Sequence, residues 1–583
     1  MKKIFVFVIS VLTLASCNMD FISSDAMTSE KLKEDPSSAV FTTDGLYSLL
    51  QDNLAYKGQS GGESGNYYIR HYFQLSELRG DNVTVSGTTE DPFIFPYAYE
   101  DIPTTKNIYY TWWIAYKIIN AANSNIAAIV PGASADSDHL LGENYFFRAL
   151  AHFHMVTLFA MPYVCGRENP GVVLRIGTDN STTTRASVGD VYDAIVDDLK
   201  TAISFMTQVP SRGDKSYVSQ NAAKALLSRV YLYMGDEHLQ DCLDLCNDLM
   251  TNAPSVVTEG YDFADYPTHT YNHDETIWCL RLDENHDFAK SDHAEASIAS
   301  MYLEDGQGWG EHYWSDILID LFQRYPEDKR FAAYFRMNGL TDDGKMMVTF
   351  PYKTKATNNY CSSFIAHGLT ADTDGAYSFQ YNNVTYKAVP TEVNTYTQYI
   401  VTGIDFVTGE TGETKTSRVF VRPDVNKTKG VRENGGDYVI YYNTKFSYQD
   451  GKPMLTSPVF LRWGEVVLNR AEANAKLSHD QLALDDVNII RTRAGLPEEA
   501  MMTLDNYAER GYDSILDVVL DERRMELCFE GQRAFDVYRN KKKLDRRFVG
   551  FHSYEEIDYT DKRIALLIPS DEINTSHIAQ NPR

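Results

Sequence analysis

The chain has 583 residues, 43% of them hydrophobic, and its 54 Lys and Arg against 81 Asp and Glu give a formal net charge of −27. A negative field of this size repels phosphate backbones, which excludes nucleic acid as a partner. Beyond the N-terminal segment no stretch approaches the ~20 consecutive apolar residues that span a bilayer, so we expect a peripheral protein with a large buried core.

The N-terminus carries a short apolar run behind two positive charges. Lys2 and Lys3 precede the run from Ile4 to Leu14. As a helix this run would cover roughly 16 Å, well short of the ~30 Å hydrocarbon core. A positive segment followed by a short apolar one is typical of a secretory signal peptide. A buried N-terminal helix is the alternative, but the run has neither a polar face nor a cap.

The end of the apolar run accounts for the lone cysteine at position 17. The sequence LASC, residues 14–17, resembles the lipobox of bacterial lipoproteins. This resemblance implies that residues 1–16 are a signal peptide that is removed, and that Cys17 is acylated and becomes the first residue of the mature protein. Two or more acyl chains give stable membrane anchoring. We expect the lipidated cysteine and the polar residues after it, 17–40, to be a flexible tether.

Long helical patterns fill the part from residue 41 to residue 253. Apolar residues recur at helical spacing in five segments: 109–129, 142–162, 187–203, 219–235 and 239–249. In the fourth segment Ser219 is suited to cap the N-terminus of the helix, and Gly235 is suited to end it. Because the fifth segment follows within a few residues, the two predict a helical hairpin.

The C-terminal part, residues 457–583, repeats this pattern. Residues 460–477 and 481–495 form a second predicted helical pair, and a further helix is expected over about 512–530. Consecutive hairpins with small residues at their contacts resemble tetratricopeptide repeats, although the full repeat consensus is absent.

The middle of the chain, residues 254–456, has a different character. It is rich in Gly, Asn and Asp, carries short strand-like runs such as 418–422 and 438–442, and shows helical periodicity over about 315–338 only. We expect long loops and small hairpins inserted into the helical frame. The predicted fold class is therefore mainly α, with tetratricopeptide-like helical hairpins and a loop-rich, partly β, irregular insertion in one compact unit.

Four segments, in order along the chain, carry longer patterns. They read GENYFFRALAHFHMVTLFAMPYV, SQNAAKALLSRVYLYMGD, LRWGEVVLNRAEANAKL with VNIIRTRAGLP, and ILDVVLDERRMELCFEGQRAFDVYRN with LLIPSDEINTSHIAQNP. Together with the lipobox, these segments resemble the SusD/RagB family of surface nutrient-binding lipoproteins of Bacteroidota. Phe147 and His152 depart from the more usual residues of the first segment.

The resemblance implies a fold, a location and a role. Members of the family share the SusD-like fold, sit on the outer leaflet of the outer membrane, and bind glycan or, in some branches, peptide. They cover a TonB-dependent, SusC-like transporter and are not catalysts. We therefore expect a carbohydrate-binding protein held in outer-membrane lipid through Cys17, facing the extracellular side, without cofactor or metal.

One carboxylate cluster is a candidate for catalysis. Its acids are Asp521, Glu522, Glu526 and Glu530, and the arginines interleaved with them are Arg523, Arg524 and Arg533. Two carboxylates at the right separation could hydrolyse a glycosidic bond. Acids and arginines alternate at helical spacing, however, so we expect each acid to have a guanidinium neighbour. Such pairing keeps an acid ionised, which does not suit a general acid.

Two loops, residues 79–101 and 304–316, have the composition of a sugar-binding surface, which needs aromatic faces and a few polar side chains. Their candidate ligand-binding residues are Asp81, Asn82, Phe93, Phe95, Tyr97, Tyr99, Trp309, Tyr313 and Trp314. In an extended, exposed loop the alternation of the four rings from position 93 to 99 would place them on one side. Trp309 lies between flexible glycine-rich neighbours, so we expect its display to ligand.

The alternative for these loops is that their rings fold back onto the helical frame. Trp112, Trp113 and Trp463 lie within helical patterns and are expected in the core. The sequence thus predicts a protein that captures an oligosaccharide or polysaccharide for a transporter. A peptide-binding, RagB-like member with the same fold, a glycoside hydrolase with a carboxylate pair near the aromatic loops, and a pure scaffold are the other possibilities.

Overall fold

The computed structural model describes residues 37–583 except 53, 55–66, 86, 180, 182, 207–211, 285–296, 307, 354–361 and 431–436. The expected signal peptide, Cys17 and most of the expected tether lie outside the described residues. The first described helix begins at Ser37, so residues 37–40 of the expected tether are helical.

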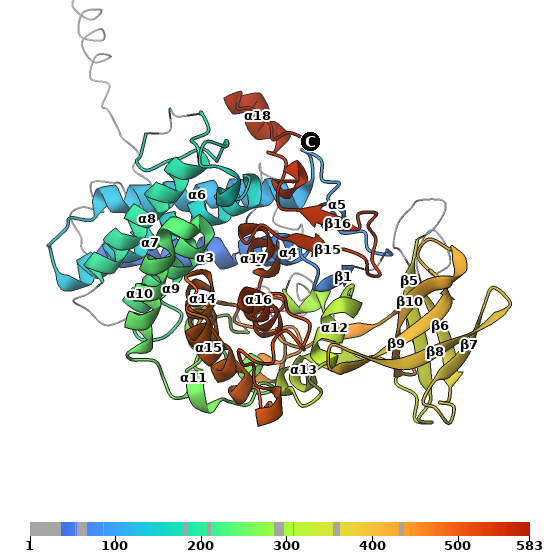
Figure 1. The fold of residues 1–583 in the computed structure, drawn as a ribbon. Coiled ribbons are helices and arrows are strands. Elements are labelled where there is room, and N and C mark those ends of the chain that lie inside the picture. Colours follow the sequence, from blue (N-terminus) through green and yellow to red (C-terminus); the bar gives the residue numbers. More distant parts are fainter. Residues whose placement is uncertain are drawn as a thin grey trace, which may run out of the picture.

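Helices dominate the described residues between 37 and 260 (Figure 1). They are α3 (Ser37–Gln51), α4 (Tyr68–Glu77), α5 (Ile94–Ala98), α6 (Lys106–Ala128), α7 (Ala135–Phe159), α8 (Val188–Phe205), α9 (Gln220–Met234), α10 (Leu239–Met250) and α11 (Val256–Glu259). From α6 to α10 each helix packs on the next one, as expected of helical hairpins. Most of α7 is buried because apolar residues surround it on nearly all sides.

The boundaries of α9 fall at the residues that predict them. The Ser219 hydroxyl accepts a hydrogen bond from the Ala222 backbone N–H at 3.2 Å and so caps the helix. Gly235 ends the helix with a φ of 86°, a conformation that favours glycine. Both predictions are confirmed.

The C-terminal helices continue the frame begun by the first ones. They are α14 (Trp463–Lys476), α15 (Asp480–Arg493), α16 (Ile515–Glu526), α17 (Arg533–Arg539) and α18 (Ser570–Ser576). Helix α14 packs on α10 as well as on α15 and α16, which joins the two ends of the chain. Helix α16 is shorter than predicted, because the chain turns at Phe529 and Gly531, which have φ values of 67° and 73°.

An antiparallel sheet of eight strands occupies much of the middle region and projects from the helical body (Figure 1). Its strand order is β11-β12-β6-β5-β10-β9-β8-β7. The strands are β5 (Met346–Tyr352), β6 (Ser362–Leu369), β7 (Tyr377–Tyr381), β8 (Val384–Val393), β9 (Tyr396–Ile404), β10 (Thr411–Pro423), β11 (Thr428–Gly430) and β12 (Asp437–Val439). The expectation of loops and small hairpins is therefore wrong in scale. The sheet has an aromatic cluster of its own, in which Phe350 stacks on Phe406 at 3.8 Å between ring centres.

Shorter elements connect the sheet with the helices. Four antiparallel strand pairs are β1 (Val83–Val85) with β3 (His312–Trp314), β2 (Thr276–Cys279) with β14 (Val459–Arg462), β4 (Phe335–Met337) with β13 (Tyr441–Asn443), and β15 (Lys543–Asp545) with β16 (Glu556–Asp558). The helical periodicity predicted over about 315–338 corresponds to two helices, α12 (Asp316–Gln323) and α13 (Lys329–Tyr334), and the end of that range is strand β4. Across the described residues, none of the helices combines the length and apolarity needed to cross a bilayer.

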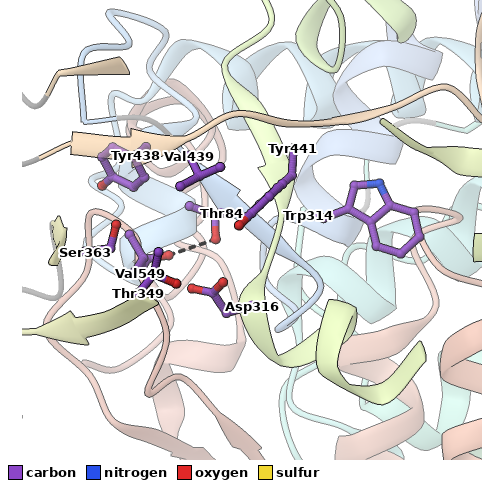
Figure 2. A pocket seen from close by; sticks show the side chains of 9 residues that line it. All are labelled: Thr84, Trp314, Asp316, Thr349, Ser363, Tyr438, Val439, Tyr441 and Val549. Carbon is purple, nitrogen blue, oxygen red and sulfur yellow. Dashed lines mark hydrogen bonds between the residues drawn. The ribbon is translucent and has the colours of Figure 1, made fainter. Parts of the chain in front are cut away.

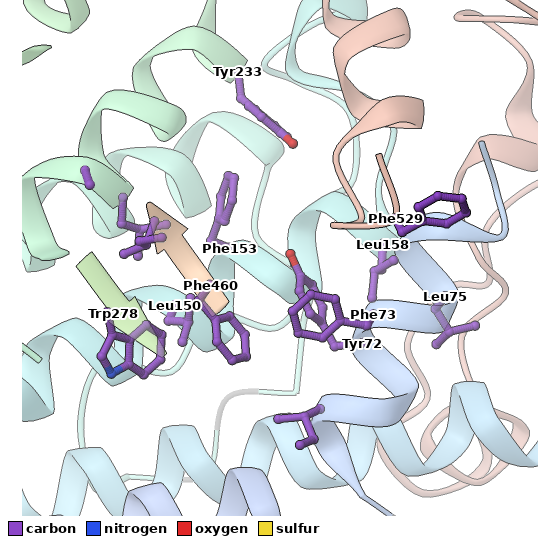
Figure 3. Packing of buried hydrophobic residues seen from close by; sticks show 14 of the residues in the cluster. Tyr72, Phe73, Leu75, Leu150, Phe153, Leu158, Tyr233, Trp278, Phe460 and Phe529 are labelled. Atoms are coloured by element: carbon purple, nitrogen blue, oxygen red, sulfur yellow. The ribbon is translucent and has the colours of Figure 1, made fainter. Parts of the chain in front are cut away.

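One large hydrophobic core joins residues from both ends of the chain (Figure 3). Trp278 of β2 belongs to this core and is fully buried. Its ring centre is 5.2 Å from that of Phe146 in α7 and 4.8 Å from that of Phe460 in β14. The indole N–H donates to the Ser216 carbonyl at 3.2 Å, so the ring is both packed and hydrogen-bonded.

Trp278→Ala should lower the free energy of unfolding by about 3–5 kcal/mol, because it removes a large ring from a packed core and leaves a cavity. Chemical denaturation followed by circular dichroism measures the change. Trp309→Ala, at an exposed ring, is the matched control and should shift the midpoint little. Equal shifts for the two variants would contradict the placement of Trp278 in the core.

Candidate ligand-binding surface

Strand pairing brings the two aromatic loops of the sequence together. β1 pairs with β3 so that Val83 lies opposite Trp314. Just after β3, the Ser315 hydroxyl donates to the Asp81 carbonyl at 2.6 Å. The first loop is thereby fixed against the second, and the two belong to one site although they are far apart in the sequence.

Trp309 is the exposed ring of this site. Its side chain is 40% exposed, and none of the other five tryptophans, all of which lie within the described residues, is exposed. Its backbone N–H donates to the Ser300 carbonyl at 2.7 Å. Glycines permit this turn, since a Cβ at Gly308 would collide with the Leu303 carbonyl and Gly310 has a φ of 55°. The ring is therefore held outward by a constrained backbone.

Arg70, from α4, connects Trp309 with the first loop. Its guanidinium carbon lies 5.9 Å from the ring centre of Trp309 and 5.4 Å from that of Phe93, within the range of a cation–π contact. The guanidinium donates to Asp91 Oδ2 at 2.7 Å. Burial alone would raise the pKa of Asp91, but Arg70 outweighs it and lowers this pKa. The indole thus lies beside a fixed, ionised pair.

Further polar groups surround the turn that carries Trp309. Arg336 of β4 donates two hydrogen bonds to Asp305, at 2.8 and 2.9 Å, and the Tyr448 hydroxyl donates to the same carboxylate. Glu304 pairs with Lys427 at 3.2 Å. These side chains are partly exposed. We define the Trp309 surface as Trp309, Glu304, Asp305, Arg336 and Tyr448 together with Arg70, which is itself buried.

The four rings of the first loop are arranged differently from the prediction. Residues 94–98 form the short helix α5, so the expectation of an extended segment is wrong. Phe93 and Tyr97 are four residues apart, one turn of helix, so both face the body and are buried. Tyr99 is also buried, and its φ of 60° places its backbone in the left-handed region. Phe95 alone is exposed.

The polar candidates of the first loop are also interior residues. Arg533 donates to Asp81 Oδ1 at 2.8 Å, and Arg524 donates to Asn82 Oδ1 at 2.8 Å. Burial would raise the pKa of Asp81, but the two arginines lower it. Asp81 and Asn82 therefore fix the loop to the C-terminal helices, and the expectation that they are displayed to a ligand is wrong.

Tyr313 and Trp314 lie in β3 with their rings in the core. The Trp314 ring centre is 4.9 Å from that of Phe529. Neither ring is exposed to a ligand, because β3 pairs with β1 and its side chains pack in the interior beneath the turn that carries Trp309. Of the nine candidate residues, Trp309 and Phe95 reach the surface, and their role in binding stays a prediction.

Of the six residues of the Trp309 surface only Trp309 was among the candidates. Glu304 and Asp305 lie within the predicted loop 304–316, whereas Arg70, Arg336 and Tyr448 lie outside both loops. Arg70 lies in the aromatic run YYIRHYF, where a lone charge needs a partner once buried. A charged residue inside an aromatic run is therefore a signal from which Arg70 could have been predicted. Arg336 and Tyr448 come from separate segments with no local pattern, and only the fold brings them to Asp305.

The carboxylate cluster of α16 is a buried ion-pair network. Glu526 accepts hydrogen bonds from Arg330 at 2.8 Å, from Arg462 at 2.6 Å and from Arg493. Burial would raise the pKa of Glu526, but these arginines hold it well below its usual value. Two further acids pair in the same manner, Glu522 with Arg330 and Arg491, and Glu530 with Arg462 and Lys445. Asp521 is partly exposed and lies 3.9 Å from Arg324. The prediction that each acid has a guanidinium neighbour is confirmed, but all of these neighbours come from other elements, and none of them is Arg523, Arg524 or Arg533.

Glu77 is a different buried carboxyl. Burial raises its pKa to about 7, which is the range of a general acid. Its carboxylate accepts hydrogen bonds from the backbone N–H groups of Phe529 and Gly531, at 3.2 and 2.7 Å, and its side chain is enclosed. Glu77 therefore fastens α4 to the turn after α16 and does not line the Trp309 surface.

Figure 2 shows a gap where the eight-stranded sheet meets the body. Its volume is about 10 Å³, which is room for about one water molecule. Beside it the Thr84 hydroxyl donates to the Val549 carbonyl at 2.8 Å. The gap is too small for a nutrient ligand. Within the described part of the chain, no three His, Cys, Asp or Glu side chains are grouped to hold a metal ion.

A frame of helical hairpins, a β insertion and an exposed ring beside ion pairs define a mainly α protein with a SusD-like fold. A family model described as the SusD family matches residues 274–572, and one described as "Starch-binding associating with outer membrane" matches residues 25–232. The chain therefore belongs to the SusD family, and the description of the second model refers to association with the outer membrane. The predicted family and fold class are confirmed.

Individual relatives agree with this assignment. SusD-like protein P2 of Formosa agariphila is 21% identical over 441 residues, which are 74% of this chain and 71% of that protein. A SusD superfamily structure from Bacteroides thetaiotaomicron superposes with a TM-score of 0.64 and 22% identity, covering 94% of this chain and 100% of that one. A structure from Bacteroides vulgatus, described as a SusD-like carbohydrate binding protein, gives a TM-score of 0.58 and 15% identity over 93% and 96% of the two chains.

Glu526→Gln should destabilise the protein by about 3–5 kcal/mol, because three buried guanidinium groups lose their shared carboxylate. Thermal unfolding of the purified variant measures the loss. Glu413→Gln, an exposed glutamate of β10, is the matched control and should leave the midpoint unchanged. An unchanged midpoint for Glu526→Gln would show that the network does not hold the fold together.

Proposed function

We propose that the protein captures an oligosaccharide or polysaccharide at the Trp309 surface and delivers it to a TonB-dependent, SusC-like transporter. The observation that carries the proposal is the one exposed tryptophan, held outward by its backbone beside ionised pairs. Family membership supports the ligand class, and a related structure is described as carbohydrate binding.

The chemistry of a sugar ring suits such a surface. The C–H face of a pyranose packs on a flat aromatic ring, and its hydroxyls need fixed donors and acceptors at the edge. Asp305 and Arg336 form a two-bond pair that keeps both groups ionised and in place. A neutral polyol can exchange hydrogen bonds with them without displacing a buried charge.

The proposed location follows from the N-terminus and from the family. Acyl chains on Cys17 would hold the protein in the outer membrane, and the following residues would give the body reach. On the extracellular face such a protein meets a polysaccharide before a transporter does. Capture and release, without bond cleavage, is the activity that this arrangement serves.

Trp309→Ala should weaken glycan binding at least tenfold, equivalent to about 1.4 kcal/mol, because the ring supplies the stacking face. Affinity gel electrophoresis against plant, microbial and host glycans identifies the ligand, and calorimetry on that ligand gives the dissociation constants. Arg336→Gln should weaken binding by a smaller factor, since it removes one partner of Asp305 and leaves the ring.

Phe41→Ala is the matched control, because Phe41 is an exposed ring on α3, a helix that packs among α4, α6 and α7. It should bind like the unchanged protein. Equal binding by Trp309→Ala would refute the proposed surface. Binding of peptides but of no glycan would favour the RagB-like alternative, and release of reducing sugar would favour the hydrolase.

Cys17→Ser should abolish incorporation of labelled palmitate and move the protein from the membrane to the soluble fraction, because the thiol is the proposed acylation site. The experiment is done by expression in a Bacteroidota host, followed by fractionation and by protease treatment of intact cells. Ser23→Ala, in the same polar segment, is the control and should stay anchored. Membrane retention of Cys17→Ser would argue against lipid anchoring at this residue.

A further inference from the structure

A second pocket lies between α6 and the C-terminal segment, with a volume of about 120 Å³. None of its lining residues belongs to the Trp309 surface. One wall is aromatic, the opposite side is charged, and the two sides come from opposite ends of the chain. This combination is typical of a small-molecule site, which has apolar walls and a few fixed polar groups.

The aromatic wall is one face of α6. Tyr109, Trp112, Trp113 and Tyr116 recur at positions i, i+3, i+4 and i+7, which share a side of the helix. Trp112 is buried at the base, with its ring centre 5.1 Å from that of Tyr116 and 5.0 Å from that of Phe159. Tyr109, Trp113 and Tyr116 are half-buried. The base is therefore fixed, and the other rings border the opening.

The charged side is supplied by the first turn of α18. Asp571 accepts a hydrogen bond from the Tyr109 hydroxyl, and Glu572 accepts one from the Trp112 indole N–H at 3.4 Å. The Ser576 hydroxyl also donates to Glu572, at 2.5 Å. These bonds orient both carboxylates toward the aromatic wall, although the residues are more than 450 positions apart.

Positive charges balance the two carboxylates. The Arg175 guanidinium carbon lies 5.5 Å from the Tyr116 ring centre and lines the same pocket. The Lys117 ammonium lies 4.7 Å from the ring centre of Trp113, over one face of that ring. Two negative and two positive groups leave little net field. A neutral polar ligand is thus favoured over an amine or an acid.

The volume sets the size of the ligand. A protein cavity of about 150 Å³ accommodates one benzene ring. A pocket of about 120 Å³ is slightly smaller than that cavity, so it can take one six-membered ring only with part of the ring in its open mouth, and it cannot take a chain. We propose that this pocket is a second carbohydrate subsite, which takes a single neutral pyranose residue with its C–H face on Trp113 and its hydroxyls on Asp571, Glu572 and Arg175. The choice of carbohydrate rests on the proposed function.

Fluorine NMR of the full-length chain, labelled with 5-fluorotryptophan in a sugar-free detergent, tests the proposal. The six tryptophans give six resonances, and Trp113→Phe and Trp309→Phe assign the two that matter. Methyl glycosides of neutral hexoses and pentoses are titrated, with a methyl glucuronide and methyl glucosaminide for comparison. Trp463, in the core, reports any general perturbation.

We expect at least one neutral glycoside to shift the Trp113 resonance saturably, with a dissociation constant on the order of 1 mM. The shift should persist in Trp309→Phe, and the charged sugars should bind at least fivefold more weakly. Asp571→Asn should weaken binding at least fivefold without moving the Trp309 resonance.

The outcomes separate this proposal from the proposed function. A Trp309 response with a silent Trp113 would overturn the second subsite and leave glycan capture standing. A Trp113 response with a silent Trp309 would support the pocket and count against the Trp309 surface. Silence of both resonances across the panel, or a Trp113 shift that disappears in Trp309→Phe, would overturn the second subsite.

Discussion

The structure depends on a buried carboxylate, Glu526, that three arginines share. Arg330 comes from α13, Arg462 from β14 and Arg493 from α15, while Glu526 ends α16. Glu275, next to β2, pairs with two of the same arginines. Removing one partner from a buried network costs far more than a surface pair contributes, because the remaining charge stays desolvated. The network therefore holds the end of the middle region and the C-terminal helices in one arrangement.

The same helix, α16, is linked to the Trp309 surface through Arg524. Gly464 of the neighbouring helix α14 leaves room for the ion-pair network, because a Cβ at this position would collide with Arg493 and Arg462. Two residues before Glu526, Arg524 turns outward from the network and binds Asp81 and Asn82. Those two residues precede β1, and β1 sets β3 and the Trp309 turn in place. The position of the exposed ring is thus linked to the interior by a short series of ion pairs and backbone contacts.

The sequence predicted the elements whose signals are local. The cap at Ser219 and the stop at Gly235 each act within a turn of helix, and both are found. The acids of α16 do have arginine partners, but these come from distant segments and not from the local alternation. The eight-stranded sheet and the short helix α5 were missed, because strand partners are distant and five residues carry too little periodicity. Asp81 was read as exposed for a similar reason: its partners Arg524 and Arg533 lie more than 440 positions away.

The aromatic residues show why composition alone locates a fold better than a site. Most rings of this tyrosine-rich chain pack inward, since burying a large ring stabilises the core whether or not a ligand exists. A ring that stays accessible to solvent must be kept there by the structure around it. At Trp309 the reason is a glycine-bounded turn next to Arg70, and at Trp113 it is a wall of α6 facing the carboxylates of α18. In both places the polar partners come from distant segments. What distinguishes a proposed binding surface from packing is therefore the presence of ionised groups beside an accessible ring, and not the ring alone.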